Sequence, residues 1–66
     1  MNFTPNNLLD WRDRKYRGKR GILTFRLYAH GWLVTYSPDA DPTQRETIEG
    51  VDIWTACRFA NDREGY

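Results

Sequence analysis

The alternation of apolar and polar residues on both sides of His30-Gly31 constrains this chain more than any other feature. Residues 22–37 match a β-hairpin whose two-residue turn is His30-Gly31, because glycine accepts positive φ and histidine tolerates the left-handed region. This register places Phe25 opposite Tyr36. It predicts one wholly apolar or aromatic face, made of Phe25, Leu27, Ala29, Trp32, Val34 and Tyr36.

The other face of the predicted hairpin is mixed and turns toward solvent. Its expected cross-strand pairs are Tyr28 with Leu33, Arg26 with Thr35, and Thr24 with Ser37. A shift of the pairing by one residue would mix the two faces, so alternation and turn chemistry favour the same register.

The segment before the hairpin has the features of an N-terminal helix. Thr4 is a good N-cap and Pro5 suits the first helical position, which predicts a helix over 5–17 ended by Gly18. Two acid-to-base pairs at i,i+4 spacing support it, Asp10–Arg14 and Asp13–Arg17.

After the hairpin, the sequence predicts a loop, a third strand over 44–48 and a second helix. Asp52 is the expected N-cap of that helix, which runs from Ile53 to about Asp62, with 63–66 as a frayed tail. Its expected apolar stripe is Ile53, Ala56, Cys57 and Ala60, with Trp54 at the edge. The predicted fold class is α+β, a small two-layer α-β-β-β-α domain with a three-stranded antiparallel meander.

The length of 66 residues predicts one small domain covering 1–66, of marginal stability. A second copy is one way to cover an exposed strand edge, so a homodimer is one expectation. A single cysteine excludes an internal disulfide and favours a reducing compartment. Because no apolar run approaches the roughly 20 residues that span a bilayer, and the start lacks signal-peptide features, we expect a soluble cytoplasmic protein without a membrane partner.

Charge is divided unevenly along the chain. Residues 1–33 carry seven basic and two acidic side chains, a net of +5, whereas residues 34–66 carry three basic and seven acidic ones, a net of −4. Two interpretations stay open at this point. Either one end binds a charged partner, or the two ends neutralise each other in the fold.

The residues that carry chemistry in other proteins are sparse here. Cys57 lies on a predicted apolar stripe and His30 in a turn, so nothing connects a nucleophile to a base. Asp39 and Asp41 fit turn chemistry, and one histidine with one cysteine does not make a zinc site. We therefore predict no enzyme activity, no catalytic residue, no metal and no cofactor.

A binding role fits the composition better. We expect a small binding or inhibitor-type protein, like the accessory proteins of phages and mobile elements, that contacts a larger protein or nucleoprotein partner. The alternative is direct DNA or RNA binding through the basic segment 12–20, since phosphates reward clustered cations. A solvated helix face is the competing interpretation of that segment. The candidate binding residues for either role are Arg12, Lys15, Tyr16, Lys19, Arg20, Arg26 and Tyr28.

Overall fold

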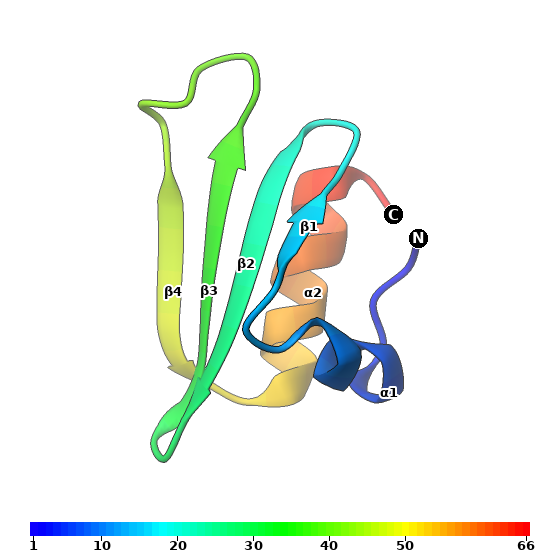
Figure 1. The fold of residues 1–66 in the computed structure, drawn as a ribbon, viewed down its shortest axis with the longest axis vertical. Helices are drawn as coiled ribbons and strands as arrows, with labels where there is room; N and C mark the ends of the chain where they lie inside the picture. Colours follow the sequence, from blue (N-terminus) through cyan, green and yellow to red (C-terminus); the bar gives the residue numbers. More distant parts are fainter.

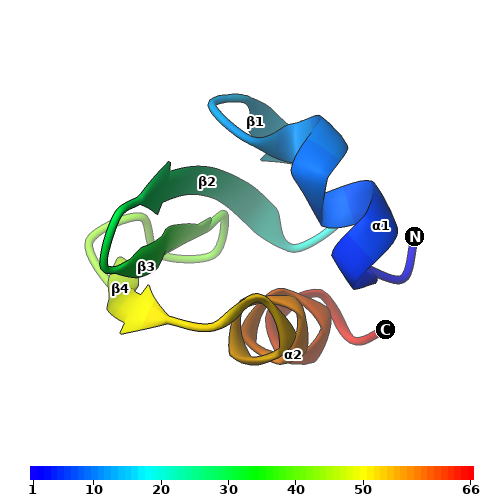
Figure 2. The same cartoon turned by 90° about the horizontal axis from the view of Figure 1, so that it is seen from below.

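The computed structural model describes all 66 residues. They form one antiparallel sheet with helices on one of its faces (Figures 1 and 2). The sheet is a meander with strand order β1-β2-β3-β4. Helix α2 packs against the sheet, and α1 packs beside α2. In chain order the elements are α1 (Pro5–Leu8), a 3-10 turn η1 (Leu9–Trp11), β1 (Lys15–Arg17), β2 (Gly21–Tyr28), β3 (Gly31–Pro38), β4 (Glu46–Val51) and α2 (Ile53–Glu64).

This architecture confirms the expected α+β class, with a helix at each end and an antiparallel sheet between them. The sheet has four strands instead of three, because the segment 15–17 adds a strand at the β2 edge. None of the helices has the length and apolar content needed to cross a bilayer.

The central hairpin is present, but its predicted register is wrong. Its turn is Ala29-His30, so Tyr28 faces Gly31 and Phe25 faces Val34 instead of Tyr36. The shift moves each partner by two residues, which keeps every side chain on its predicted face. The buried face therefore still contains Phe25, Trp32, Val34 and Tyr36, joined by Leu23, whereas Leu27 is 41% exposed and Ala29 lies in the turn.

Gly31 explains why the observed turn differs from the predicted one. It has φ of +130° but begins strand β3, and neither turn residue has positive φ. A Cβ at Gly31 would lie 2.8 Å from backbone atoms of Gly50 and Val51. The glycine is thus required by the close approach of β4 to the hairpin end, a contact between segments that are distant in sequence.

The predicted helix over 5–17 is wrong beyond its first turns. Thr4 and Pro5 do start α1, and Thr4 forms a capping box with Asn7, but the α-helix ends at Leu8 and η1 at Trp11. Asp13 then adopts φ of +62°, which reverses the chain and directs β1 alongside β2. Gly18 lies in the β1–β2 turn and does not end a helix.

The second half of the chain follows its prediction more closely. Strand β4 forms where 44–48 was predicted, although it starts at Glu46 and extends to Val51. It carries one extra residue relative to β3, because Val34 pairs with Ile48 and Trp32 with Val51. Asp52 caps α2 through the Thr55 amide, as expected, and the predicted stripe supplies the buried Ala56, Cys57 and Ala60.

The predicted frayed tail is ordered, which corrects the expectation for 63–66. Glu64 is 4% exposed, Gly65 ends α2 with φ of +75°, and the Tyr66 amide donates to the Asn61 carbonyl at 2.9 Å. The C-terminal turn therefore belongs to the packed structure. The apolar core comprises Phe3, Leu8, Leu23, Phe25, Trp32, Val34, Tyr36, Ala56, Cys57 and Ala60.

Candidate functional site

Five exposed cations gather along the β1 edge of the sheet and form the strongest candidate site. They come from the strand itself, from the loop before it and from the turn after it. None of them takes part in an ion pair, and none of their side chains makes a hydrogen bond within the protein. We call this group the basic edge: Arg12, Arg14, Lys15, Lys19 and Arg20.

The basic edge is uncompensated because the expected helical partners do not form. Arg17 pairs instead with Asp39 of the β3–β4 loop at 2.7 and 2.8 Å, and these hydrogen bonds raise the pKa of its guanidinium. Arg14 is left without an acidic partner. Arg14 is not among the predicted binding residues, because the predicted helix paired it with Asp10.

The turn that presents Lys19 and Arg20 is held in place by Glu64 at the end of α2. The Glu64 carboxylate accepts hydrogen bonds from the Lys19 amide at 2.7 Å and from the Arg20 amide at 3.3 and 3.4 Å. A Cβ at Gly18 would lie 1.9 Å from the same carboxylate. Because the amides of both residues bond to Glu64, the turn that carries these two cations is fixed to the end of α2.

Tyr16 does not belong to the exposed site. Its ring makes edge-to-face contacts with Phe3 and Trp11, at ring-centroid distances of 4.9 and 5.1 Å. Its hydroxyl forms a 2.6 Å hydrogen bond with the Tyr66 hydroxyl, which with burial raises the pKa of Tyr16 to about 12. Tyr16 is the residue of β1 that faces the core, so it anchors the edge strand and is not free to stack on a ligand.

Arg26 and Tyr28 lie on the outer face of β2, which no helix covers (Figure 2). Arg26 reaches Asp13 only at 4.0 Å, and both side chains are largely exposed. Tyr28 is 46% exposed and stacks on His30 at the end of the hairpin, with 5.7 Å between the ring centroids. The structure therefore places Arg26 next to the loop that precedes β1, whereas Tyr28 lies at the hairpin end of β2.

The two halves of the chain keep their opposite charges in the fold. Of the three ion pairs, only Arg17–Asp39 joins the basic first half to the acidic second half. The basic half supplies the β1 edge, and the acidic half supplies the opposite β4 edge, which carries Glu46 and Glu49. Mutual neutralisation, one of the two interpretations above, is therefore limited to one contact.

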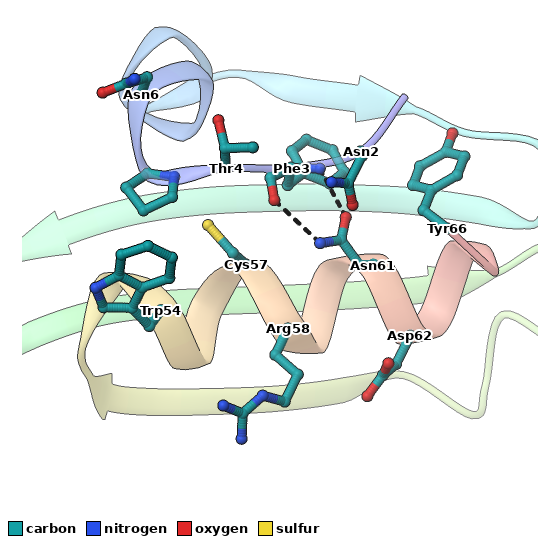
Figure 3. A pocket seen from close by; sticks show the side chains of 11 residues that line it. Asn2, Phe3, Thr4, Asn6, Trp54, Cys57, Arg58, Asn61, Asp62 and Tyr66 are labelled. Carbon is teal, nitrogen blue, oxygen red and sulfur yellow. Dashed lines mark hydrogen bonds between the residues drawn. The ribbon is translucent and has the colours of Figure 1, made fainter.

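The concave region of the molecule is elsewhere, an open groove of about 690 Å³ between the N-terminal segment and α2 (Figure 3). Trp54, which is 65% exposed, and Arg58 lie along it. At its centre, the Asn61 side chain accepts a hydrogen bond from the Phe3 amide at 2.7 Å and donates one to the Phe3 carbonyl at 3.0 Å. This side-chain amide holds the N-terminal segment on α2, so it is not free to bind a ligand.

The residues with catalytic potential are not brought together. Cys57 is buried on α2, and burial raises the pKa of its thiol. His30 lies in the β2–β3 turn beside Tyr28. Asp41 holds its own loop by accepting from the Thr43 amide and hydroxyl, and no three His, Cys, Asp or Glu side chains form a group suited to a metal ion.

Comparisons with protein-family models, curated proteins and solved structures found no match to this chain.

Proposed function

We propose that this protein is a non-enzymatic nucleic-acid-binding protein that contacts phosphates through the basic edge. The observation that carries the proposal is the row of five exposed cations without acidic partners along β1 and its flanking loops. Cations that neutralise phosphates release condensed counterions, which drives binding without regard to base sequence. Arg26 extends the same surface onto the outer face of β2.

Nucleic acid suits this surface better than a protein partner does. Protein interfaces rely on buried aromatic anchors surrounded by a polar rim. Tyr16, the one aromatic residue within the basic segment, packs on Phe3 and Trp11 and is hydrogen-bonded to Tyr66. What remains exposed along β1 is charge without an aromatic centre, which matches a phosphate backbone more closely than a protein surface.

The form of the cation row also supports the proposal. The cations lie on the strand and in the loop and turn at its two ends, so positive charge is spread along the length of the β1 edge, and several phosphates can be contacted at once. Glu64 fixes the turn at one end of the row, so less conformational entropy is lost on binding. The free Cys57 thiol is compatible with the reducing cytoplasm, where nucleic acid is accessible.

The direct test is fluorescence anisotropy with mixed-sequence duplex DNA, single-stranded DNA and RNA, titrated between about 50 and 200 mM salt. We expect log affinity to fall linearly with log salt, by about 0.9 for each phosphate contacted on a duplex. Reversing Arg14, Lys15 and Lys19 to glutamate should abolish binding while circular dichroism shows an intact fold. Arg20 is left unchanged because its guanidinium lies against Gly65 of the α2 terminus.

The matched control compares two single reversals with the same change in net charge. Lys15→Glu, on the basic edge, should weaken binding, whereas Arg58→Glu, at an exposed position of α2, should change it little. Equal effects of the two variants would show that only net charge matters and would overturn the site. Absence of binding to all three nucleic acids at low salt would overturn the function and favour an acidic protein surface as the partner.

A further inference from the structure

Strand β4 is the other edge of the sheet, and nothing in the fold covers its outer side (Figure 1). Edge strands present a row of unpaired backbone amides and carbonyls, which a second strand can complete. Residues 45–47 and 49 are exposed, and Ile48 is half-buried. Arg45 and Glu49, two residues to either side of Thr47, have no ion-pair partner.

We propose that two copies of this chain associate through β4, antiparallel and centred on Thr47. In an antiparallel pair centred on one residue, the residues two before and two after it face each other. Arg45 then lies opposite Glu49 of the second copy, and the two-fold symmetry repeats that pair. Because Arg45 and Glu49 carry opposite charges and have no partner within the chain, each complements the other across such a pairing. This complementarity favours a second copy of the chain as the partner of β4.

The geometry of β4 fits this arrangement. Thr47 pairs with Thr35, whose hydroxyl bonds Thr24 on the uncovered face, so Thr47 belongs to that outer face. Glu46 points the other way and bonds Arg63 of α2 at 2.6 Å. A dimer centred on Thr47 thus leaves the Glu46–Arg63 pair intact and places both α2 helices on the same side of an eight-stranded sheet.

The same reasoning excludes the β1 edge as the dimer contact. β1 has only three residues, and pairing it with itself would bring the cations of two basic edges together. On β4, the extra residue before Val51 and the positive φ of Gly50 end the regular strand after Glu49. The self-pairing is therefore confined to 45–49, and the dimer should form at high micromolar concentration rather than be obligate.

The first experiment is a charge exchange followed by analytical ultracentrifugation over increasing protein concentration. Wild-type protein should shift from the 7.9 kDa monomer toward twice that mass. Glu49→Arg or Arg45→Glu alone places like charges opposite each other and should raise the dissociation constant about tenfold. The double variant Arg45→Glu/Glu49→Arg exchanges the pair and should restore wild-type association.

The second experiment fixes the register by cysteine crosslinking under an added oxidant. Residues directly opposite each other have Cα atoms about 4.5–5.5 Å apart, within disulfide range, so Thr47→Cys should crosslink to its symmetry mate. Glu49→Cys is the control, because its mate is four residues away along the strand, more than about 10 Å. Cys57 is buried and should not contribute.

These outcomes decide the proposal. A mass that stays at the monomer value up to millimolar concentration would overturn it. So would a double variant no better than the single ones, or crosslinking of Glu49→Cys in place of Thr47→Cys. The assay contains no nucleic acid, so its result is independent of the function proposed for the basic edge.

Discussion

The Glu64 carboxylate, almost fully buried at the end of α2, accepts a hydrogen bond from the backbone amide of Lys19 at 2.7 Å. It also accepts hydrogen bonds from the Arg20 amide and, at 3.4 Å, from the Tyr36 hydroxyl. One side chain thus joins the last turn of the helix to the β1–β2 turn and to β3. The position of two of the five cations of the basic edge, Lys19 and Arg20, depends on this contact.

Glu64→Ala should destabilise the protein by about 1–3 kcal/mol, because it leaves the partly buried amides of Lys19 and Arg20 without a partner. Glu64→Gln retains an acceptor oxygen and should cost less. Urea unfolding measures both variants, with exposed Asp10→Ala as the control. A Glu64→Ala midpoint equal to that of the control would show that water replaces the carboxylate at no cost.

Phe25→Ala should cost about 3–5 kcal/mol, enough to unfold a marginal domain. Leu27→Ala, on the same strand and the same face, should cost about 1 kcal/mol or less, because Leu27 is 41% exposed. Thermal melting followed by circular dichroism compares the two. Similar melting temperatures would contradict the difference in burial between the two side chains, which are 0% exposed for Phe25 and 41% exposed for Leu27.

Asp39→Ala should tighten nucleic-acid binding. The substitution removes an anion and releases Arg17, which would join the five free cations of the basic edge. We expect about fivefold higher affinity at low salt and a salt dependence steeper by about one phosphate contact. Asp62→Ala changes net charge equally on α2 and serves as the control, and an equal gain there would argue against a local effect.

Acid should destabilise the protein partly through Glu46. Hydrogen bonds from Arg63 at 2.6 and 2.9 Å hold the pKa of Glu46 below its ordinary value of 4.5. Its contribution to stability is therefore complete above that value and is lost as pH falls toward the lower folded pKa. Glu46→Gln should reduce the difference in urea midpoint between neutral and acidic pH. The effect should stay below about 1 kcal/mol, because the pair is partly exposed.

The faces of the hairpin were predictable, although its register was not. Side chains alternate with a period of two, so a two-residue shift of each partner preserves which residues are buried. The turn itself was decided by Gly31, which must lack a side chain because Gly50 and Val51 approach it. That requirement arises from a strand about twenty residues away and has no local signal.

The segment 12–20 shows the limit of local patterns more clearly. Two charge pairs at i,i+4 spacing favour a helix by only about 0.2–0.5 kcal/mol each, and pairing with β2 outweighs them. Tyr16 then turns to the core between outward Lys15 and Arg17, an alternation too short to recognise in a sequence. Four of the five cations of the basic edge were among the predicted binding residues, and Arg14 was not. That these cations lack acidic partners follows from the strand that replaces the predicted helix, which local patterns did not indicate.

The bond between Asn61 and Phe3 joins residues separated by 58 positions and has a consequence for the order of folding. The meander pairs only strands that are neighbours in the chain, so its hairpins can form early, with short loops to close. The Phe3 ring packs on Tyr16 and Phe25 of the sheet, but the Phe3 backbone is held only once Asn61 of α2 is in place. The joint docking of α2 and the N-terminal segment should therefore follow the rate-limiting step, so that substitutions at Asn61 speed unfolding far more than they slow folding.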